Sequence, residues 1–344
     1  MGAATLHGVN LAGWLIPEAW ITPEVFAGTG ALTMRELQEN LDEATYARLI
    51  AHHRAVFMTK ANFASIAARG LDAVRIIVPW NIFGGEIPTI GGEPCIEYVD
   101  RAFVWAQEYG LKILLSINTP LSGATSDVYE ERRAEMRDRR DALVELNGML
   151  ASRYKDSEAL LGIEPMDAPL LAERRGFSLL SGMPVHQLRN YYRDAYAAIR
   201  SAAGEKPWVV FADGGKTNSW YAFMASRSYK NVYLGVQLFH NNDDISHIDL
   251  RDVNKLVETS SRALSRAQRS GLPVIVTGWS AQLPFPSSST TPEGRIALER
   301  VYVASQIACF QQSPAWFFQT YKTSLRLAGW DARVALSSFE KDRL

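Results

Sequence analysis

LGIEPMDAPL, residues 161–170, begins as a short apolar run and ends in a turn. A buried parallel strand has this pattern where it leaves the core of an α/β barrel, and such barrels place their chemistry at the C-terminal ends of their strands. At that end the chain carries Asp167, Ala168 and Pro169. The stretch therefore predicts a barrel strand whose functional end holds one acidic side chain beside a methyl group.

Seven further stretches have the Val-, Ile- and Leu-rich or aromatic composition of buried strands. They are residues 6–13, 73–79, 112–118, 208–213, 232–239, 273–279 and 315–321. Helical spacing of apolar residues between the strands predicts helices, the clearest being 41–52, 59–69, 98–109, 185–199, 252–270 and 292–310, the last with Thr291 as N-cap. This alternation predicts an α/β fold, a single (β/α)8 TIM barrel. Because no linker or change in composition divides residues 1–344, we expect one domain.

Composition restricts the class of partner. The formal net charge is −1 and no basic stripe is visible, which argues against nucleic acid. No apolar run is long enough to cross a bilayer, so we expect no membrane segment.

The two cysteines, Cys95 and Cys309, are too far apart in the sequence for a metal motif or a disulfide framework, and we expect neither a metal nor a cofactor. No leader is visible before the first strand, which leaves the compartment open, or cytoplasmic if the N-terminus is native.

Two motifs near the N-terminus, GVNLAGWL at 8–15 and AWITP at 19–23, resemble the opening of glycoside hydrolase family 5 in its exo-1,3-β-glucanase-like branch. The similarity continues through residues 63–76, 162–164, 276–280 and 316–323, and so spans nearly the whole chain in order. It implies a (β/α)8 barrel that carries out retaining glycoside hydrolysis. Such enzymes use one glutamate as acid/base and a second as nucleophile, about 5 Å apart.

Both catalytic positions fall on residues without a carboxylate. The fourth-strand Asn-Glu-Pro of the family corresponds to Asp167-Ala168-Pro169, so Ala168 stands at the acid/base position. The seventh-strand Gly-Glu-Trp-Ser corresponds to residues 277–280, which places Gly278 at the nucleophile position. Alanine cannot donate a proton and glycine cannot attack an anomeric carbon. The resemblance therefore supports the fold and argues against the reaction.

Most other pocket positions of the family are also replaced. Asn118 stands for the third-strand histidine, Gln237 and Phe239 for the sixth-strand histidine and tyrosine, and Gln319 for the eighth-strand tryptophan. Only the second-strand arginine, Arg75, is retained, and we expect it to pair with Asp167 or Glu18. The residues expected around the binding pocket are Glu18, Arg75, Asn118, Asp167, Gln237, Phe239, Trp279 and Gln319.

The sequence supports two main functional hypotheses. The first is a catalytically inactive pseudo-glycosidase that binds a glycan or a protein partner. The second is an active hydrolase of a β-glucan or related glycoside, in which Asp167 acts with a loop carboxylate from Glu18, Asp243 or Asp244. An inverting pair of this kind needs its carboxyl groups about 6.5–9.5 Å apart. Residues 240–244 (HNNDD) are most simply a solvated turn. A barrel adapted to unrelated chemistry is a third hypothesis.

Overall fold

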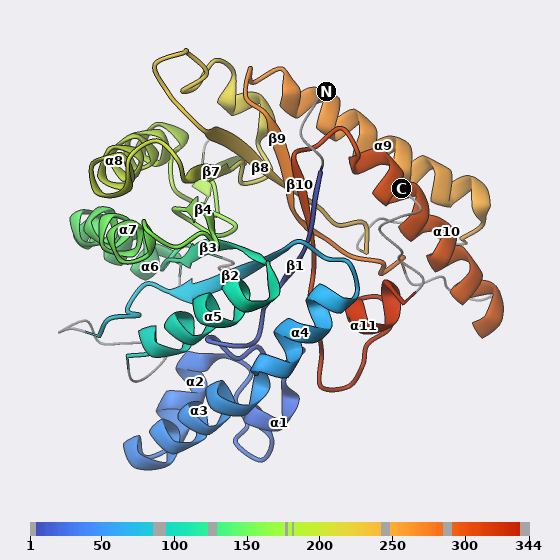
Figure 1. The fold of residues 1–344 in the computed structure, drawn as a ribbon, viewed down its shortest axis with the longest axis horizontal. Coiled ribbons are helices and arrows are strands. Elements are labelled where there is room, and N and C mark those ends of the chain that lie inside the picture. Colours follow the sequence, from blue (N-terminus) through green and yellow to red (C-terminus); the bar gives the residue numbers. More distant parts are fainter. Residues whose placement is uncertain are drawn as a thin grey trace.

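A closed barrel of eight parallel strands forms the centre of the computed structural model, which describes residues 5–84, 94–122, 129–175, 178–180, 182–241, 248–284 and 291–337 (Figure 1). The strands are β1 (Leu6–Asn10), β2 (Ala73–Pro79), β3 (Lys112–Asn118), β4 (Leu160–Glu164), β7 (Trp208–Ala212), β8 (Val232–Leu238), β9 (Val274–Trp279) and β10 (Ala315–Phe318). Their order around the barrel is β1-β10-β9-β8-β7-β4-β3-β2. The predicted (β/α)8 fold is confirmed. The first and last strands end three residues earlier than expected, at Asn10 and Phe318.

Helices surround the barrel and account for the buried outer faces of its strands. They are α1 (Pro23–Phe26), α2 (Met34–Asn40), α3 (Glu43–Phe57), α4 (Lys60–Ala68), α5 (Ile96–Tyr109), α6 (Tyr129–Asp138), α7 (Arg140–Tyr154), α8 (Val185–Ala203), α9 (Leu250–Gln268), α10 (Pro292–Phe310) and α11 (Ala332–Ala335). A 3₁₀ turn, η2, covers Thr217–Trp220. Thr291 caps α10 as predicted, because its hydroxyl accepts from the Gly294 amide at 3.1 Å.

The interior of the barrel has its own apolar cluster, to which β2, β3, β4, β7, β9 and β10 all contribute. In β3, Leu114 belongs to this inner cluster, whereas Ile113 and Leu115 pack outward against the helices. This period of two is the pleat of a strand buried on both faces. In β4, Gly162 is required by close packing, since a Cβ built there would lie 2.3 Å from the Trp208 carbonyl oxygen.

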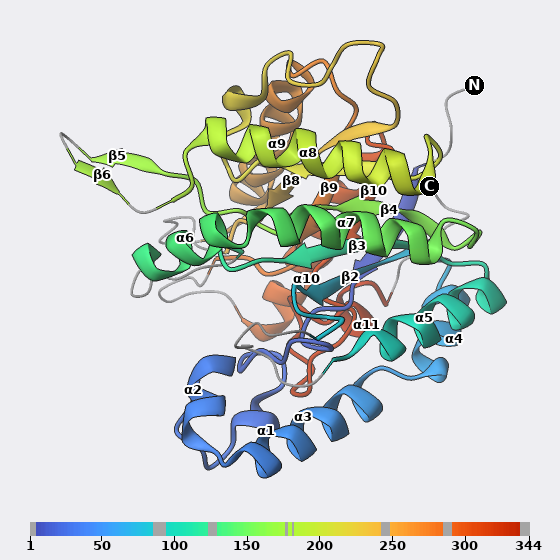
Figure 2. The ribbon, with the colours of Figure 1, turned by 90° about the vertical axis from the view of Figure 1, so that its left-hand side faces the viewer.

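Two additions to the barrel were not predicted from the sequence. Helices α1 and α2 pack with α3 around a separate apolar cluster at one edge of the molecule (Figure 2). A hairpin of β5 (Glu173–Arg175) and β6 (Ser178–Leu180) follows β4 and projects away from the barrel (Figure 2). Its strands are three residues long, too short for a period-two pattern to be read.

None of the helices in the described part of the chain combines the length and apolarity that a membrane crossing requires.

Candidate functional site at the barrel mouth

The loop after β4 divides the C-terminal mouth of the barrel into two parts. β4 ends at Glu164, so Asp167, Ala168 and Pro169 lie above the strand rather than in it. The Asp167 amide donates to the Ile117 carbonyl at 2.8 Å, and Pro169 forms a bridge with Ser122. Ala168 has φ 37°, a left-handed conformation that is uncommon for a residue other than glycine. Ala168, which the sequence aligns with the family's acid/base position, is therefore a fixed, strained point of the backbone.

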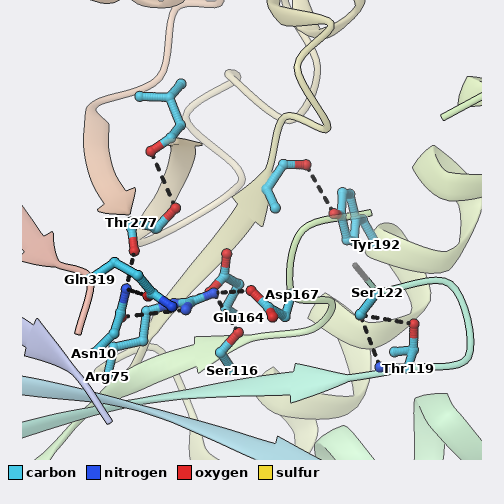
Figure 3. A network of polar contacts seen from close by, with 12 residues as sticks. Asn10, Arg75, Ser116, Thr119, Ser122, Glu164, Asp167, Tyr192, Thr277 and Gln319 are labelled. Carbon is cyan, nitrogen blue, oxygen red and sulfur yellow. Dashed lines mark hydrogen bonds and ion pairs between the residues drawn. The ribbon is translucent and has the colours of Figure 1, made fainter. Parts of the chain in front are cut away.

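Arg75 is the centre of a buried polar network beneath this loop (Figure 3). Its guanidinium donates to Glu164 at 2.6 Å, to Asp167 at 2.5 Å and to the Ser116 hydroxyl at 2.7 Å. The expected pairing of Arg75 with Asp167 is thus present. Glu164 is the partner that the sequence reading did not assign, although it belongs to the family-like motif at 162–164.

The network extends from Arg75 to β1 and β10. Arg75 also donates to the Asn10 side-chain oxygen at 3.4 Å, and the Asn10 amide group donates to the Gln319 side-chain oxygen at 2.6 Å (Figure 3). The same amide group donates to the Thr277 carbonyl at 3.0 Å. Gln319, which was expected in the pocket, therefore serves here as an acceptor that ties β10 to β1.

Two carboxyl groups compete for the single guanidinium in this network. Burial and the neighbouring Asp167 charge raise the pKa of Glu164 to about 7, although Arg75 acts in the opposite direction. One cation can neutralise only one of two buried carboxylates, so the second retains its proton to a higher pH. The network therefore holds one more carboxyl group than its single cation can neutralise.

On one side of the loop lies the Glu18 cavity, with a volume of about 210 Å³. Its lining residues are Leu11, Gly13, Trp14, Ile16, Glu18, Ile77, Asn118, Ser122 and Asp167. Glu18 accepts a hydrogen bond from the Trp20 indole at 2.9 Å. Burial raises the pKa of Glu18 to about 7 and the nearby Asp167 adds to this shift, whereas the Trp20 hydrogen bond opposes it. Three predicted pocket residues, Glu18, Asn118 and Asp167, thus face one cavity.

On the other side of the loop lies the Phe239 cavity, with a volume of about 330 Å³. It is lined by Ala168, Pro169, Ala212, Asp213, Gly214, Gly215, Gly235, Gln237 and Phe239. Asp213 accepts from the Gly215 amide at 2.9 Å and from the Thr217 hydroxyl at 2.7 Å. Burial raises the pKa of Asp213, and these two hydrogen bonds partly offset the shift. Among the described residues, the two cavities have no lining residue in common.

The space above Gly278 is occupied by its neighbours. A Cβ built on Gly278 would lie 3.0 Å from Cζ of Phe239 and 3.3 Å from Cγ of Gln237. Phe239 and Gln237 therefore pack closely against Gly278, and a side chain at this position would press against both of them.

Other predicted site residues lie elsewhere. Trp279 is fully buried on the outer side of the barrel, where its ring packs edge-on against Phe310, Trp316 and Phe318. Its side chain therefore belongs to the core and does not line either cavity. Asp243 and Asp244 lie outside the described residues. Within the described ranges, no group of three or more His, Cys, Asp or Glu side chains is placed to hold a metal ion.

Besides Glu164, the sequence reading missed Asp213 and the roles of two tryptophans. Trp20 and Trp330 meet at the mouth with ring centroids 5.1 Å apart. Asp213 had a weak signal, since it ends a predicted strand where barrels place functional residues. The contact between Trp20 and Trp330 was not predicted, because residues more than 300 positions apart in the chain give no local signal of contact.

Comparison with known proteins identifies the family. Residues 42–293 match the family model described as Cellulase (glycosyl hydrolase family 5). The chain belongs to glycosyl hydrolase family 5. The family residues are those that build the barrel from α3 to the start of α10, and they include the whole Arg75 and Glu164 region.

Curated relatives place this family 5 protein in the exo-1,3-glucanase-like branch. It is 25% identical over 374 residues to a probable glucan 1,3-beta-glucosidase A of Aspergillus clavatus, covering 97% of this chain and 86% of the relative. It is 24% identical over 372 residues to glucan 1,3-beta-glucosidase 1 of Schizosaccharomyces pombe, covering 95% and 85%. The rutinosidase structure from Aspergillus niger superposes with a TM-score of 0.78 at 16% identity, covering 98% of both chains, which supports the fold alone.

Proposed function

We propose that this family 5 barrel lacks the hydrolytic activity of its family and binds a β-glucan-type glycan at its mouth. The observation that carries the proposal is the packing at Gly278. The nucleophile position has no side chain, and the Phe239 ring lies 3.0 Å from the point where its Cβ would be. A covalent glycosyl intermediate needs a carboxylate at this place, which glycine does not supply, and any side chain here would have to displace the Phe239 ring slightly.

The acid/base position supports the same conclusion. Ala168 has no proton to give, so a leaving alkoxide would depart without general-acid assistance, a contribution typically worth ~10²–10⁴-fold in rate. The carboxyl group next to it, Asp167, is already held by Arg75 at 2.5 Å. Its engagement with a buried cation favours a structural role.

Glycan binding is supported by the chemistry of the mouth. Carboxyl and amide side chains in the two cavities, Glu18, Asn118, Asp213 and Gln237 among them, offer acceptors and donors for sugar hydroxyls. Aromatic rings lie between these polar groups and suit the apolar faces of pyranose rings. The relatives named above are described as glucan 1,3-beta-glucosidases, which favours a β-1,3-linked glucan as the ligand.

Hydrolysis and binding measured on the same protein test the proposal. We expect no turnover of aryl β-glucosides or β-1,3-glucan by the wild type, together with a rise in melting temperature when β-1,3-glucan oligosaccharides are added. A ligand at one hundred times its dissociation constant stabilises the folded state by about 2.7 kcal/mol. Turnover by the wild type that is lost in Asp167→Asn would refute the proposal.

A second function is favoured by the Glu18 cavity. Glu18 and Asp167 line the same cavity, and burial, with a smaller contribution from the Asp167 charge, raises the pKa of Glu18 to about 7. A carboxyl group whose pKa is raised in this way is suited to act as a general acid. In this alternative, Glu18 donates the proton and Asp167 activates water in an inverting hydrolysis.

Matched variants separate the two functions. If the alternative holds, Glu18→Gln and Asp167→Asn both abolish turnover. Glu158→Gln serves as the control, because Glu158 is an exposed residue before β4, at the opposite end of the barrel, where it pairs with Lys206. Sugar-dependent stabilisation without turnover in the wild type would exclude the alternative.

A further inference from the structure

A third cavity lies outside the barrel, between helices α6, α7 and α8, and has a volume of about 250 Å³. α7 and α8 run side by side, with α6 at one end of α7 (Figure 2). The floor of this lateral cavity consists of the buried side chains of Leu121, Met136, Met183 and Tyr191. Among the described residues, it shares no lining residue with the Glu18 and Phe239 cavities. Whatever binds here therefore binds outside the mouth.

The rim of the lateral cavity is polar and carries positive charge. Arg137 comes from α6, Arg140 from α7, and Gln187 and Asn190 from α8. Arg140 is half-buried and the other three are exposed. Within the described lining there are two guanidinium groups and no carboxylate. The cavity thus passes from an apolar floor to a cationic rim.

The carboxylates that pair with these two arginines do not line the cavity. Arg137 donates to Asp138 at 3.1 Å, and Arg140 donates to Asp141 at 3.3 Å and to Asp194. All three aspartates are exposed at the surface, with 51–100% of the side chain accessible. Exposed pairs of this kind contribute little, because water screens them. Each guanidinium has five N–H donors, so both arginines can also bind an anion that enters the cavity.

The floor is fixed by the segment that follows β4. The Tyr191 hydroxyl donates to the Pro165 carbonyl at 2.8 Å. The Leu170 amide donates to the Leu121 carbonyl at 3.2 Å, and the Met183 amide donates to the Leu170 carbonyl at 2.9 Å. Three of the four floor residues are therefore held by hydrogen bonds to residues 165–170. A floor that is already in place needs little ordering when a ligand binds, which favours affinity.

The volume and the side chains restrict the class of ligand. An apolar cavity of about 150 Å³ holds one benzene molecule, so about 250 Å³ holds a ring with a short chain and a head group. Methionine sulfur packs favourably against aromatic rings, and Met136 and Met183 both line the floor. Guanidinium groups match the planar, two-oxygen geometry of a carboxylate.

We propose that the lateral cavity is a binding site for a small aromatic carboxylate, with its ring on the methionine floor and its carboxylate at Arg137 and Arg140. The proposal does not rest on the proposed function, because no residue of the mouth takes part. A neutral ring compound lacks the charge that the rim recognises. Inorganic phosphate has the charge but leaves the apolar floor unfilled.

Calorimetric titration of the full chain with phenylacetate tests this assignment. We expect the uncharged phenylacetamide to bind about tenfold or more weakly, because it loses the charged hydrogen bonds at the rim, and inorganic phosphate to bind more weakly still. Arg137→Gln and Arg140→Gln should each weaken phenylacetate binding, and the double variant should bind acid and amide alike. Equal affinity of the wild type for acid and amide would overturn the proposal. A Kd for phenylacetate weaker than about 10 mM would also overturn it.

Arg262→Gln is the matched control for loss of an exposed arginine. Arg262 lies on α9, which follows β8, and donates to the Thr259 hydroxyl at 3.3 Å. This variant should bind phenylacetate as the wild type does. An equal loss of affinity in Arg262→Gln and Arg140→Gln would show that overall charge, and not the lateral cavity, attracts the ligand, which contradicts the proposal.

Hydrogen exchange locates the bound ligand in the wild type. With phenylacetate present, the Leu170 and Met183 amides should exchange more slowly, because their hydrogen bonds belong to the floor. Unchanged exchange at both amides under saturating phenylacetate would place the ligand elsewhere and overturn the assignment to this cavity.

Discussion

The two cavities at the mouth differ in the interactions beneath their walls, which are buried charges on one side and side-chain packing on the other. Beneath the Glu18 cavity, the buried cation Arg75 keeps two carboxyl partners, Glu164 and Asp167. In the Phe239 cavity, the Phe239 ring packs against Gly278, so that a Cβ built there would lie 3.0 Å from Cζ of Phe239.

The two sides differ because an unpaired buried charge and an unfilled volume destabilise the fold by different physical mechanisms. A buried guanidinium without a counter-ion is very unfavourable, so a carboxylate must remain near Arg75 wherever it comes from. Glu164 and Asp167 supply two such carboxyl groups. A glycine in β9 leaves room that a neighbouring side chain can fill by packing. Charge is therefore balanced on one side of the residue 167–169 loop, and volume on the other.

Removal of the cation should have the largest effect. Arg75→Ala leaves Glu164 and Asp167 buried without their partner, and we expect a loss of about 3–5 kcal/mol in the free energy of unfolding. Denaturant unfolding measures it. Arg153→Ala breaks an exposed pair with Asp100 and should cost about 0–1 kcal/mol. Similar losses of unfolding free energy in Arg75→Ala and Arg153→Ala would mean that the buried ion pairs beneath the Glu18 cavity do not stabilise the fold more than an exposed pair does.

A smaller loss in the free energy of unfolding is expected for a substitution at Gly278, where side chains are closely packed. Gly278→Ala adds a methyl group against Phe239 and Gln237, and overpacking of this kind costs about 1–3 kcal/mol. In a Phe239→Ala background the same change should be nearly neutral. A double-mutant cycle on unfolding free energies measures the coupling. Additive effects would show that Phe239 does not occupy the space of a side chain at 278.

The dependence of stability on pH tests the buried charges beneath the Glu18 cavity. The pKa of Glu164 is raised from 4.5 to about 7, so its protonated form is favoured in the folded state. The resulting contribution to stability is complete below pH 4.5 and is lost as the pH rises through about 7, with a slope of up to about 1.4 kcal/mol per pH unit. Glu164→Gln should flatten this part of the profile. An unchanged slope in that variant would assign the titration to another group, such as Glu18.

Much of the barrel was predictable because its signals are local. The strands 73–79 and 112–118 were predicted with their observed limits, since a continuous β-branched or aliphatic run marks a strand buried on both faces. Strand ends at the mouth were less predictable. Residues 11–13 continue the apolar pattern and residues 319–321 end in an aromatic ring, yet β1 and β10 end before them, at Asn10 and Phe318.

The candidate site was predictable only in part. Glu18, Asn118 and Asp167 were expected together and line one cavity. Trp279 was expected in the pocket because it follows Gly278, but successive residues of a strand point to opposite faces, so its ring lies in the outer core. Glu164 was quoted in a motif and given no role, because only its contact with Arg75 reveals one.

By itself, the sequence determined the (β/α)8 barrel, membership of family 5 and the absence of glutamate at positions 168 and 278. These follow from residue identity and local periodicity, which a chain carries before it folds. Only the tertiary structure decided that the mouth consists of two cavities divided by residues 167–169, that Phe239 packs against Gly278, and that Trp20 meets Trp330. Each of these is a contact between residues far apart in the chain, and such contacts exist only once the barrel has closed.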